Sequence, residues 1–340
     1  MALDLDALRA RIEQRVGEIT GERVTVQSLT PLTGGACQDN FRVELSVGDG
    51  DLEVMALRSD AKTSLPGSLR RDAECAVIHA AVARNVHTPA ARWLTQDLVR
   101  PGAWAYFLDW VEGDAIGARV TRHPTLEAAR AELPRQLAHT LAAIHSITPA
   151  DHPDLPLDRE PFGRDDDPAQ AALDFVRRTL DALPHDRPAS EFALRWLRDH
   201  APPKGEVTLV HADFRTGNFM VTPEGLAGVL DWEFAHWGDP MEDLGWLCVR
   251  DWRFGQVKQP VGGFASRADF YAAYAEASGR AVDPARVHWW EICGNLRWGS
   301  AAAVQGQRYL KGEKDIELLA IPRRAAEMEY EALRLIQVGA

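Results

Sequence analysis

The chain has 340 residues, which exceeds the usual size of one domain and predicts two folded parts. Its 46% hydrophobic and 26% charged residues are typical of a folded globular protein and exclude a disordered chain. The formal net charge of −12 argues against a nucleic-acid partner, and no apolar run approaches the roughly 20 residues that span a bilayer.

The first hundred residues predict a helix followed by an antiparallel sheet. Residues 1–19 form an amphipathic pattern with Leu5, Leu8, Ile12 and Val16 on one face, and they lack the apolar core of a signal peptide. By elimination we expect a cytoplasmic protein, and the dispersed cysteines fit free thiols. The expected strands span residues 24–29, 41–47, 52–57, 91–94 and 103–109, and a helix is expected over 69–84.

The rest of the chain is predicted to be mainly helical. The expected helices span residues 126–146, 168–183, 190–200, 264–278, 284–305 and 314–336. We place the boundary between two lobes near residues 108–113, so that residues 1–108 form the first lobe and residues 109–340 the second. The exception to the helical pattern is a small β region around LVHADFRTGNFMVTPEGLAGVLDWE, residues 209–233.

A hairpin within this β region predicts a metal site. The turn TPEG, residues 222–225, has Pro and Gly at the positions that a type I turn favours. If Thr222 faces Gly225, the ladder sets Asn218 opposite Val229, and Asn218 then lies beside Asp231. Amide and carboxylate oxygens are ligands that suit Mg²⁺, which takes its remaining ligands from water and substrate phosphates.

Other polar residues of the β region have different predicted roles. Asp213 follows the first strand by a short loop and is placed as a separate catalytic carboxylate. His211 is expected to brace that loop by hydrogen bonding. Further on, in GDPMEDLGW, Asp239 is expected to cap a helix, and both Asp239 and Asp243 are interpreted as structural.

The motifs HADFRTGN, VLDWE and HWGDPMEDLGW together resemble the aminoglycoside phosphotransferase and choline kinase-like family. The resemblance implies an α+β, bilobal, protein-kinase-like fold, with a five-stranded antiparallel sheet and a helix in the N-lobe and a mainly helical C-lobe. It implies that Asp213 accepts or orients the proton of an attacking hydroxyl and that Asn218 and Asp231 bind Mg²⁺. It also implies that Arg215 stabilises charge on the transferred phosphate of ATP.

The nucleotide-binding half follows from the same resemblance. Gly34 and Gly35 lie between the first two strands, where backbone amides could approach phosphate closely. The segment FLDWVEG resembles the family's hinge, which implies that the carbonyl of Asp109 and the amide of Val111 bind adenine. Because backbone groups rather than side chains would bind the base, the sequence does not distinguish ATP from GTP.

The cation that would bind the nucleotide phosphates departs from the family pattern. Arg58 ends the third strand where the family usually has Lys, and Lys62 is an alternative. Glu74 on the following helix is the expected ion-pair partner of Arg58, with Asp72 as the competitor.

The acceptor is a small hydroxylated molecule whose identity stays open. Trp252, Trp289, Trp290 and Trp298 could line a flat apolar pocket, but core packing is expected for most of them. The run from residue 295 to residue 333 resembles the kinase domain of acyl-CoA dehydrogenase fusion proteins, which implies a hydroxyacyl-CoA or another hydroxylated metabolite as acceptor. An antibiotic-like acceptor stays open beside these. A nucleotide-binding pseudokinase or regulatory module without transferase activity is the second hypothesis, and the sequence does not reveal the oligomeric state.

Overall fold

A computed structural model describes residues 3–32, 39–60, 65–158, 161–163, 166–313 and 316–339. Backbone contacts divide the chain into two compact units. The first unit comprises Met1–Ala83, Thr88–Val111 and Trp232–Phe234, and the second comprises Arg84–His87, Glu112–Asp231 and Ala235–Ala340. Each unit is described by itself.

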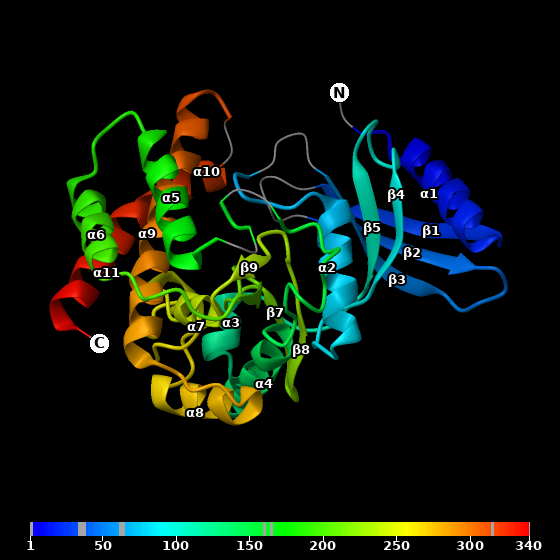
Figure 1. Ribbon diagram of the computed structural model, residues 1–340. Helices are drawn as coiled ribbons and strands as arrows, with labels where there is room; N and C mark the ends of the chain where they lie inside the picture. Colours follow the sequence, from blue (N-terminus) through cyan, green and yellow to red (C-terminus); the bar gives the residue numbers. More distant parts are fainter. Residues whose placement is uncertain are drawn as a thin grey trace. The chain divides into compact units, whose positions relative to one another are not determined.

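The first unit is a five-stranded antiparallel sheet with a helix on each face (Figure 1), and the predicted sheet is confirmed. The strand order is β1-β2-β3-β5-β4. Its elements are α1 (Leu5–Thr20), β1 (Val24–Pro31), β2 (Asp39–Val47), β3 (Glu53–Ser59), α2 (Arg71–Ala83), β4 (Ala91–Gln96) and β5 (Trp104–Asp109).

Helix α1 covers one face of this sheet through the stripe that the sequence predicts. Leu8, Ile12 and Val16 are fully buried in a core with residues of β1, β2, β3 and β5. Asp4 caps the start of the helix by accepting hydrogen bonds from two backbone amides, both at 3.1 Å. Gly21, with φ of 74°, ends it in the left-handed conformation that favours glycine.

The second unit is mainly helical and is organised around the 27-residue helix α9, which contacts α5, α6, α7 and α11 (Figure 1). Two small two-stranded sheets, β6 with β9 and β7 with β8, belong to the same unit. Its helices are α3 (Gly117–Arg122), α4 (Glu127–Ile144), α5 (Pro168–Asp181), α6 (Pro188–Asp199), α7 (Pro240–Leu247), α8 (Arg267–Ser278), α9 (Pro284–Leu310), α10 (Ile316–Ala320) and α11 (Arg324–Val338). The strands are β6 (Thr208–Val210), β7 (Phe219–Thr222), β8 (Gly225–Val229) and β9 (His236–Gly238), and short 3₁₀ turns span Pro124–Leu126, Arg250–Arg253 and Ile321–Arg323.

Two helix predictions in this unit were wrong in extent. The single helix expected over residues 314–336 is interrupted by the 3₁₀ turn at Ile321–Arg323, because Pro322 has no backbone N–H to continue an α-helix. The helix expected to begin at Phe264 begins at Arg267 instead. Ser266 caps it, since its hydroxyl accepts a hydrogen bond from the Asp269 amide at 3.1 Å.

The hairpin register also differs from the prediction by one residue. Thr222 does face Gly225, but the pairing shifts between Met220 and Val221, so the ladder reaches Phe219 opposite Val229. A β-bulge adds one residue to one strand in this way, and a regular ladder cannot anticipate it. Asn218 consequently lies opposite Leu230, whose amide donates to the Asn218 carbonyl at 2.9 Å.

No helix in the described part of the chain is long and apolar enough to cross a bilayer.

The buried stripe of α1 gives a stability prediction. Replacing Ile12 with Ala removes a fully buried side chain, and we expect the free energy of unfolding to fall by about 2–5 kcal/mol. Ile19 lies on the same helix but is 49% exposed, so Ile19→Ala should lower the free energy of unfolding much less. Urea denaturation followed by circular dichroism measures both variants, and equal losses would contradict the assigned burial of this helix.

Candidate functional site

Asp213 is the centre of a polar site in the second unit. Two residues separate it from the end of β6, and its side chain is buried. Its Oδ1 accepts hydrogen bonds from Arg215 Nε at 2.9 Å and from Trp246 Nε1 at 3.0 Å. Its Oδ2 accepts one from Asn218 Nδ2 at 2.6 Å. Three donors from separate places therefore fix the orientation of this carboxylate.

The backbone that carries Asp213 is held in a strained conformation. Ala212 has φ of 62°, a left-handed value that is uncommon for residues other than glycine. The Asp243 carboxylate accepts from the amides of both His211 and Ala212 at 2.8 Å. Arg297 donates to the Ala212 carbonyl at 2.5 Å. These hydrogen bonds together hold the loop in its strained conformation. Strain of this kind persists at functional sites when surrounding contacts hold it in this way.

Asp243 is itself fully buried and ionised. Burial acts to raise the pKa of its carboxyl, but the hydrogen bond and attraction from His145 and the hydrogen bond from the His211 amide outweigh burial, and the pKa lies below its ordinary value. His145 is supported in turn by the Tyr274 hydroxyl, 2.7 Å from its Nδ1. Asp239 accepts from the Met241 amide at 3.0 Å and caps α7, so the contacts of both acids agree with the structural interpretation.

His211 braces the loop through its ring, as the sequence predicts. Its Nδ1 accepts from the Asp213 amide at 3.2 Å, and its Nε2 donates to the Leu230 carbonyl at 3.1 Å. Burial lowers the pKa of His211, because an imidazolium loses its hydration there. A neutral ring with one acceptor and one donor nitrogen matches both bonds. The loop and the end of β8 are thereby tied together.

Asn218 and Asp231 come from neighbouring positions of the β7–β8 hairpin. The Asn218 side chain uses Nδ2 to donate to Asp213, so its amide oxygen is oriented toward other partners. Asp231 follows directly after Leu230, the residue opposite Asn218, and has a left-handed φ of 70°. Within the described ranges, no group of three or more His, Cys, Asp or Glu side chains could hold a metal ion. Two oxygen donors fit Mg²⁺ instead, which commonly takes one or two protein ligands.

Arg215 lies on an aromatic surface. Its guanidinium carbon is 4.4 Å from the centroid of the Trp252 ring, and the side chain is about one quarter exposed. Trp252 contacts Trp246 and Trp298, with ring centroids 5.6 and 5.2 Å apart. The stack holds a permanent cation beside Asp213.

Two of the four tryptophans considered for an apolar pocket pack in the core, as expected for most of them. Trp289 and Trp290 are almost fully buried and pack edge to face at 4.9 Å. Their indole N–H groups donate to Leu197 and Asp239. Buried tryptophans with satisfied N–H groups serve the core, so the alternative of core packing holds for this pair.

The first unit contains the predicted ion pair of Arg58. Arg58 Nη2 is 3.1 Å from Glu74 Oε1, and Glu74 is fully buried. The competitor Asp72 pairs instead with Arg70 at the surface. Asp72 therefore does not contribute to this cluster.

The cluster includes a cation that the sequence analysis missed. Arg71 contacts Glu74 and also reaches Glu233 Oε2 at 3.1 Å. Its i,i+3 spacing from Glu74 was a possible signal, but helix-surface pairs share that spacing. The contact with Glu233, 162 residues away along the chain, is visible only in the fold.

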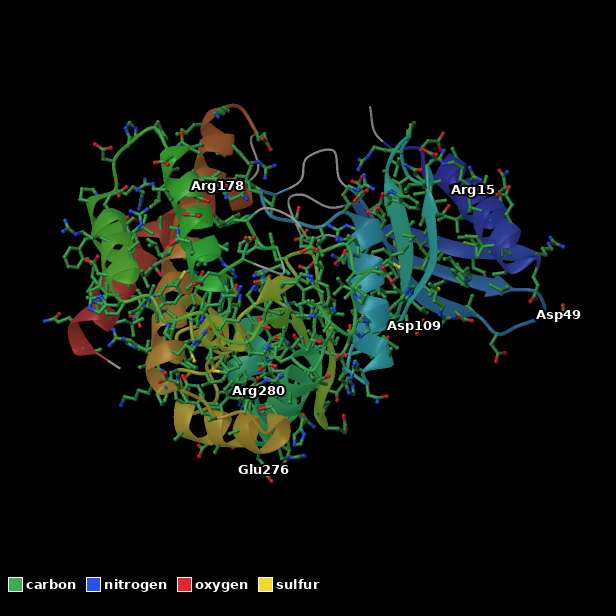
Figure 2. All side chains as sticks on the ribbon, viewed as in Figure 1. Arg15, Asp49, Asp109, Arg178, Glu276 and Arg280 are labelled. Carbon is green, nitrogen blue, oxygen red and sulfur yellow. The ribbon has the colours of Figure 1, made fainter. Side chains whose placement is uncertain are left out.

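The hinge segment begins at the end of β5 (Figure 2). The amides of Asp109 and Trp110 donate to the carbonyls of Ala90 and Val54, at 3.1 and 3.2 Å. The Val111 amide has no acceptor among the described residues. A backbone donor at that position suits an adenine edge. The predicted glycines, Gly34 and Gly35, and the alternative cation Lys62 lie outside the described residues.

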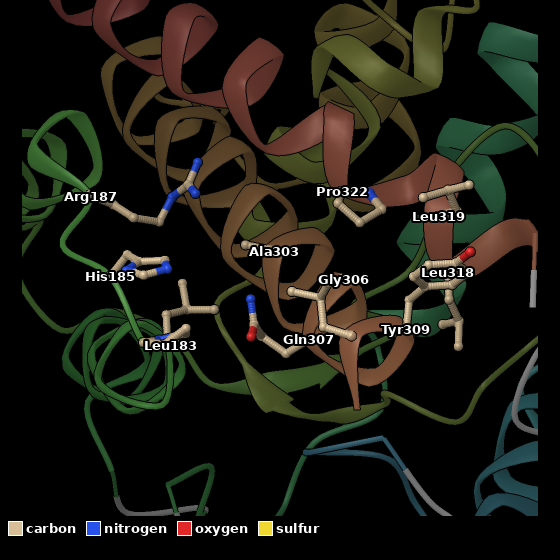
Figure 3. Close-up of a pocket in the computed structure, with 12 residues that line it drawn as sticks. Leu183, His185, Arg187, Ala303, Gly306, Gln307, Tyr309, Leu318, Leu319 and Pro322 are labelled. Carbon is tan, nitrogen blue, oxygen red and sulfur yellow. The ribbon is translucent and has the colours of Figure 1, made fainter. Parts of the chain in front are cut away.

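A pocket of about 290 Å³ lies elsewhere in the second unit (Figure 3). Side chains of the α5–α6 connection, including Arg187, face α9 residues such as Gly306 across it. An α-helix turns about 100° per residue, so Gly306 lies on the face of α9 opposite Arg297, which contacts the catalytic loop. This pocket therefore opens away from Asp213.

A second hollow, of about 310 Å³, lies beside the turn that carries Trp252. Its lining combines three arginines, Arg122, Arg250 and Arg324, with two acids, Asp251 and Glu327. Arg324 pairs with both of these acids. Asp251 accepts from the Trp298 indole at 2.7 Å, so this hollow adjoins the aromatic cluster.

The buried Asp243 generates a pH prediction. Its pKa is lowered from 3.8 in the folded chain, so its stabilising effect is fully present above pH 3.8 and is lost as pH falls through the folded value. Asp243→Asn leaves one backbone amide without an acceptor and should lower the free energy of unfolding by at least about 1–3 kcal/mol at pH 7. Urea denaturation at several pH values measures the difference in the free energy of unfolding between wild type and variant. This difference should become smaller below pH 3.8. A difference that does not change with pH would contradict the assignment of Asp243 as an ionised, stabilising carboxylate.

Comparison with known proteins identifies the family. The model of the Phosphotransferase enzyme family matches residues 28–290. Mouse acyl-CoA dehydrogenase family member 10 is 28% identical over 255 residues, which cover 73% of this chain and 22% of that protein. Chicken acyl-CoA dehydrogenase family member 11 is 29% identical over 185 residues, covering 53% of this chain and 23% of that protein. The chain thus spans less than a quarter of the length of these two relatives.

Solved structures show the same fold. A protein of Ralstonia eutropha assigned to the aminoglycoside phosphotransferases superposes with a TM-score of 0.73 at 20% identity, with all of both chains covered. A choline/ethanolamine kinase family protein of Mesorhizobium loti gives 0.61 at 17% identity, covering 98% of this chain and 94% of that one. The predicted protein-kinase-like fold is confirmed, and the chain belongs to the phosphotransferase enzyme family.

Proposed function

We propose that the protein is a Mg²⁺- and ATP-dependent kinase that phosphorylates a hydroxyl of a small metabolite, with Asp213 as the base. The observation that carries this proposal is the Asp213 carboxylate, which three donors hold in one orientation, including Asn218 at 2.6 Å. A base must be fixed within hydrogen-bond reach of the proton that it accepts. The strained loop and its support by Asp243 serve that requirement.

The reaction assigns one role to each residue of the loop. The acceptor hydroxyl gives its proton to Asp213 while its oxygen forms a bond to the γ-phosphorus. The bond from that phosphorus to the bridging oxygen breaks, and its electron pair leaves with ADP. Arg215 stabilises the negative charge on the phosphoryl group in transfer, which is the main demand of this chemistry.

Mg²⁺ would neutralise charge on the nucleotide phosphates when bound. Asn218, through its amide oxygen, and Asp231, through its carboxylate, are the residues that would hold it. The orientation of the Asn218 amide supports this assignment, because Nδ2 is already used by Asp213.

In this proposal residues 1–108 bind the nucleotide phosphates, the segment directly after them binds adenine, and the catalytic residues follow later in residues 109–340. Arg58, oriented by Glu74 at 3.1 Å, binds the α and β phosphates, and a planar guanidinium suits that role. The Asp109 carbonyl and the Val111 amide bind adenine, and Gly34 and Gly35 approach the phosphates. Solved structures with this fold contain either GDP or AMP-PNP, so GTP is kept as a possible phosphate donor beside ATP.

The acceptor that we favour is an anionic hydroxylated metabolite of the hydroxyacyl-CoA kind. Relatives named as acyl-CoA dehydrogenase family members support this choice. Aminoglycosides, which solved structures of this fold bind, are therefore the less favoured acceptors.

The role of Asp213 is tested by Asp213→Asn. Loss of a general base should lower metal-dependent ATP turnover, measured with a panel of hydroxy acids and hydroxyacyl-CoA esters, by about 10²–10⁴-fold. Asp181, which is 63% exposed on α5, provides the control Asp181→Asn, with turnover expected at the wild-type level. Equal turnover by Asp213→Asn and wild type would make the assignment of the base wrong. Nucleotide binding without turnover, and without response to Mg²⁺, would favour a regulatory module.

The role of Arg58 is tested by nucleotide affinity. Arg58→Ala removes a charge-assisted contact to phosphate and leaves Glu74 buried without that partner. We expect the Kd for MgATP, measured by calorimetry, to rise at least about tenfold, equivalent to about 1.4 kcal/mol. Arg15 on α1 points outward (Figure 2) and its side chain is 45% exposed, so Arg15→Ala serves as the control. An unchanged Kd in Arg58→Ala would remove Arg58 from the nucleotide site.

A further inference from the structure

The two oxygens of Asp213 have unequal surroundings. A carboxylate offers about four lone-pair positions, two on each oxygen. Oδ1 has both positions filled, by Arg215 at 2.9 Å and by Trp246 at 3.0 Å. Oδ2 has one filled, by Asn218 at 2.6 Å. One lone pair of the carboxylate is therefore left for the acceptor hydroxyl, and it lies on Oδ2.

We propose that Trp246 is a positioning residue which, together with Arg215, blocks Oδ1 and makes Oδ2 the atom that accepts the proton of the acceptor hydroxyl. This inference rests on the proposed function of Asp213 as the base. It adds a residue outside the loop that carries Asp213. It also assigns the proton transfer to one oxygen, on the side of the carboxylate where Asn218 lies.

The surroundings of Trp246 suit this role. The residue lies in α7, three positions after Asp243, so the same helix holds both the loop backbone and the carboxylate. Its ring is buried, and Arg297 stacks on it with a guanidinium-to-centroid distance of 4.0 Å. Arg297 also donates to the Ala212 carbonyl and pairs with Glu242 at 2.7 Å. Arg297 thus holds the indole of Trp246 close to the backbone that carries Asp213.

Loss of the indole N–H should affect the reaction more than nucleotide binding. Without Trp246, Oδ1 regains a lone pair, and an acceptor hydroxyl can bind there in an orientation that does not lead to transfer. Proton transfer from the hydroxyl then occurs in a smaller fraction of the bound complexes, while the contacts to ATP are unchanged. Displacement of reacting groups by about 1 Å can cost on the order of 10²-fold in rate.

The test uses the full chain and MgATP, with water as the phosphoryl acceptor. In Trp246→Phe we expect kcat to fall about 10- to 100-fold while KM for ATP changes by less than about twofold. Trp246→His loses similar packing but keeps a ring N–H, so it should recover part of the lost kcat. An equal loss in both variants would show that packing alone matters and would overturn the proposal.

Trp237 provides a matched control. It is as deeply buried as Trp246, in β9, and its indole nitrogen has no hydrogen-bond partner among the described residues. Trp237→Phe therefore makes the same chemical change without removing a donor from Asp213. Its kcat should stay within about twofold of wild type, and a fall as large as that of Trp246→Phe would overturn the assigned role.

Nuclear magnetic resonance separates failure of this inference from failure of the proposed function. The indole N–H resonance of Trp246, assigned by its absence in Trp246→Phe, should shift in Asp213→Ala. A shift combined with no turnover of ATP or of the hydroxy-metabolite panel by wild type would overturn the proposed function and, with it, the catalytic role of Trp246. Normal turnover with no shift would overturn the hydrogen bond and leave the proposed function standing.

Discussion

The second unit depends on one buried carboxylate more than on any other group. Asp243 accepts hydrogen bonds from the backbone amides of His211 and Ala212, and it is ionised although it is fully buried. A buried charge is tolerated only when hydrogen bonds and opposite charges satisfy it, and here two amides and His145 do so. The left-handed Ala212 is the consequence, because the two bonds hold its backbone in a conformation that a free alanine would leave. The direction of the Asp213 side chain follows from that backbone.

A second layer of contacts converts this loop into an asymmetric site. Asp213 receives donors from its own loop, from the start of β7 and from α7, and these leave one oxygen more accessible than the other. Arg215 is held on Trp252, so its charge stays close to the carboxylate. The arrangement suits phosphoryl transfer, in which positioning and charge stabilisation matter more than covalent chemistry by the protein.

The first unit uses buried charges in a different way. Glu74 is shared by Arg58 and Arg71, and Arg71 extends the cluster to Glu233, two residues after Asp231 in the chain. A guanidinium whose partner is fixed and buried loses little freedom when it binds phosphate. This supports the proposal that Arg58 binds the nucleotide phosphates. The family assignment adds the reaction class, whereas the low identity to solved structures leaves the acceptor to direct experiment.

The sequence by itself determined those features that depend on local chemistry. Alternating strands gave the five-stranded sheet, the stripe of α1 gave its buried face, and the spacing of Asp213, Asn218 and Asp231 indicated a phosphotransferase. Only the tertiary structure decided what depends on contacts between distant segments. The bulge that sets Asn218 opposite Leu230, the burial of Trp289 and Trp290, and the reach of Trp246 to Asp213, 33 residues away, are of this kind. Periodicity and motif spacing describe neighbours along the chain, whereas these features arise from packing between elements that no local pattern encodes.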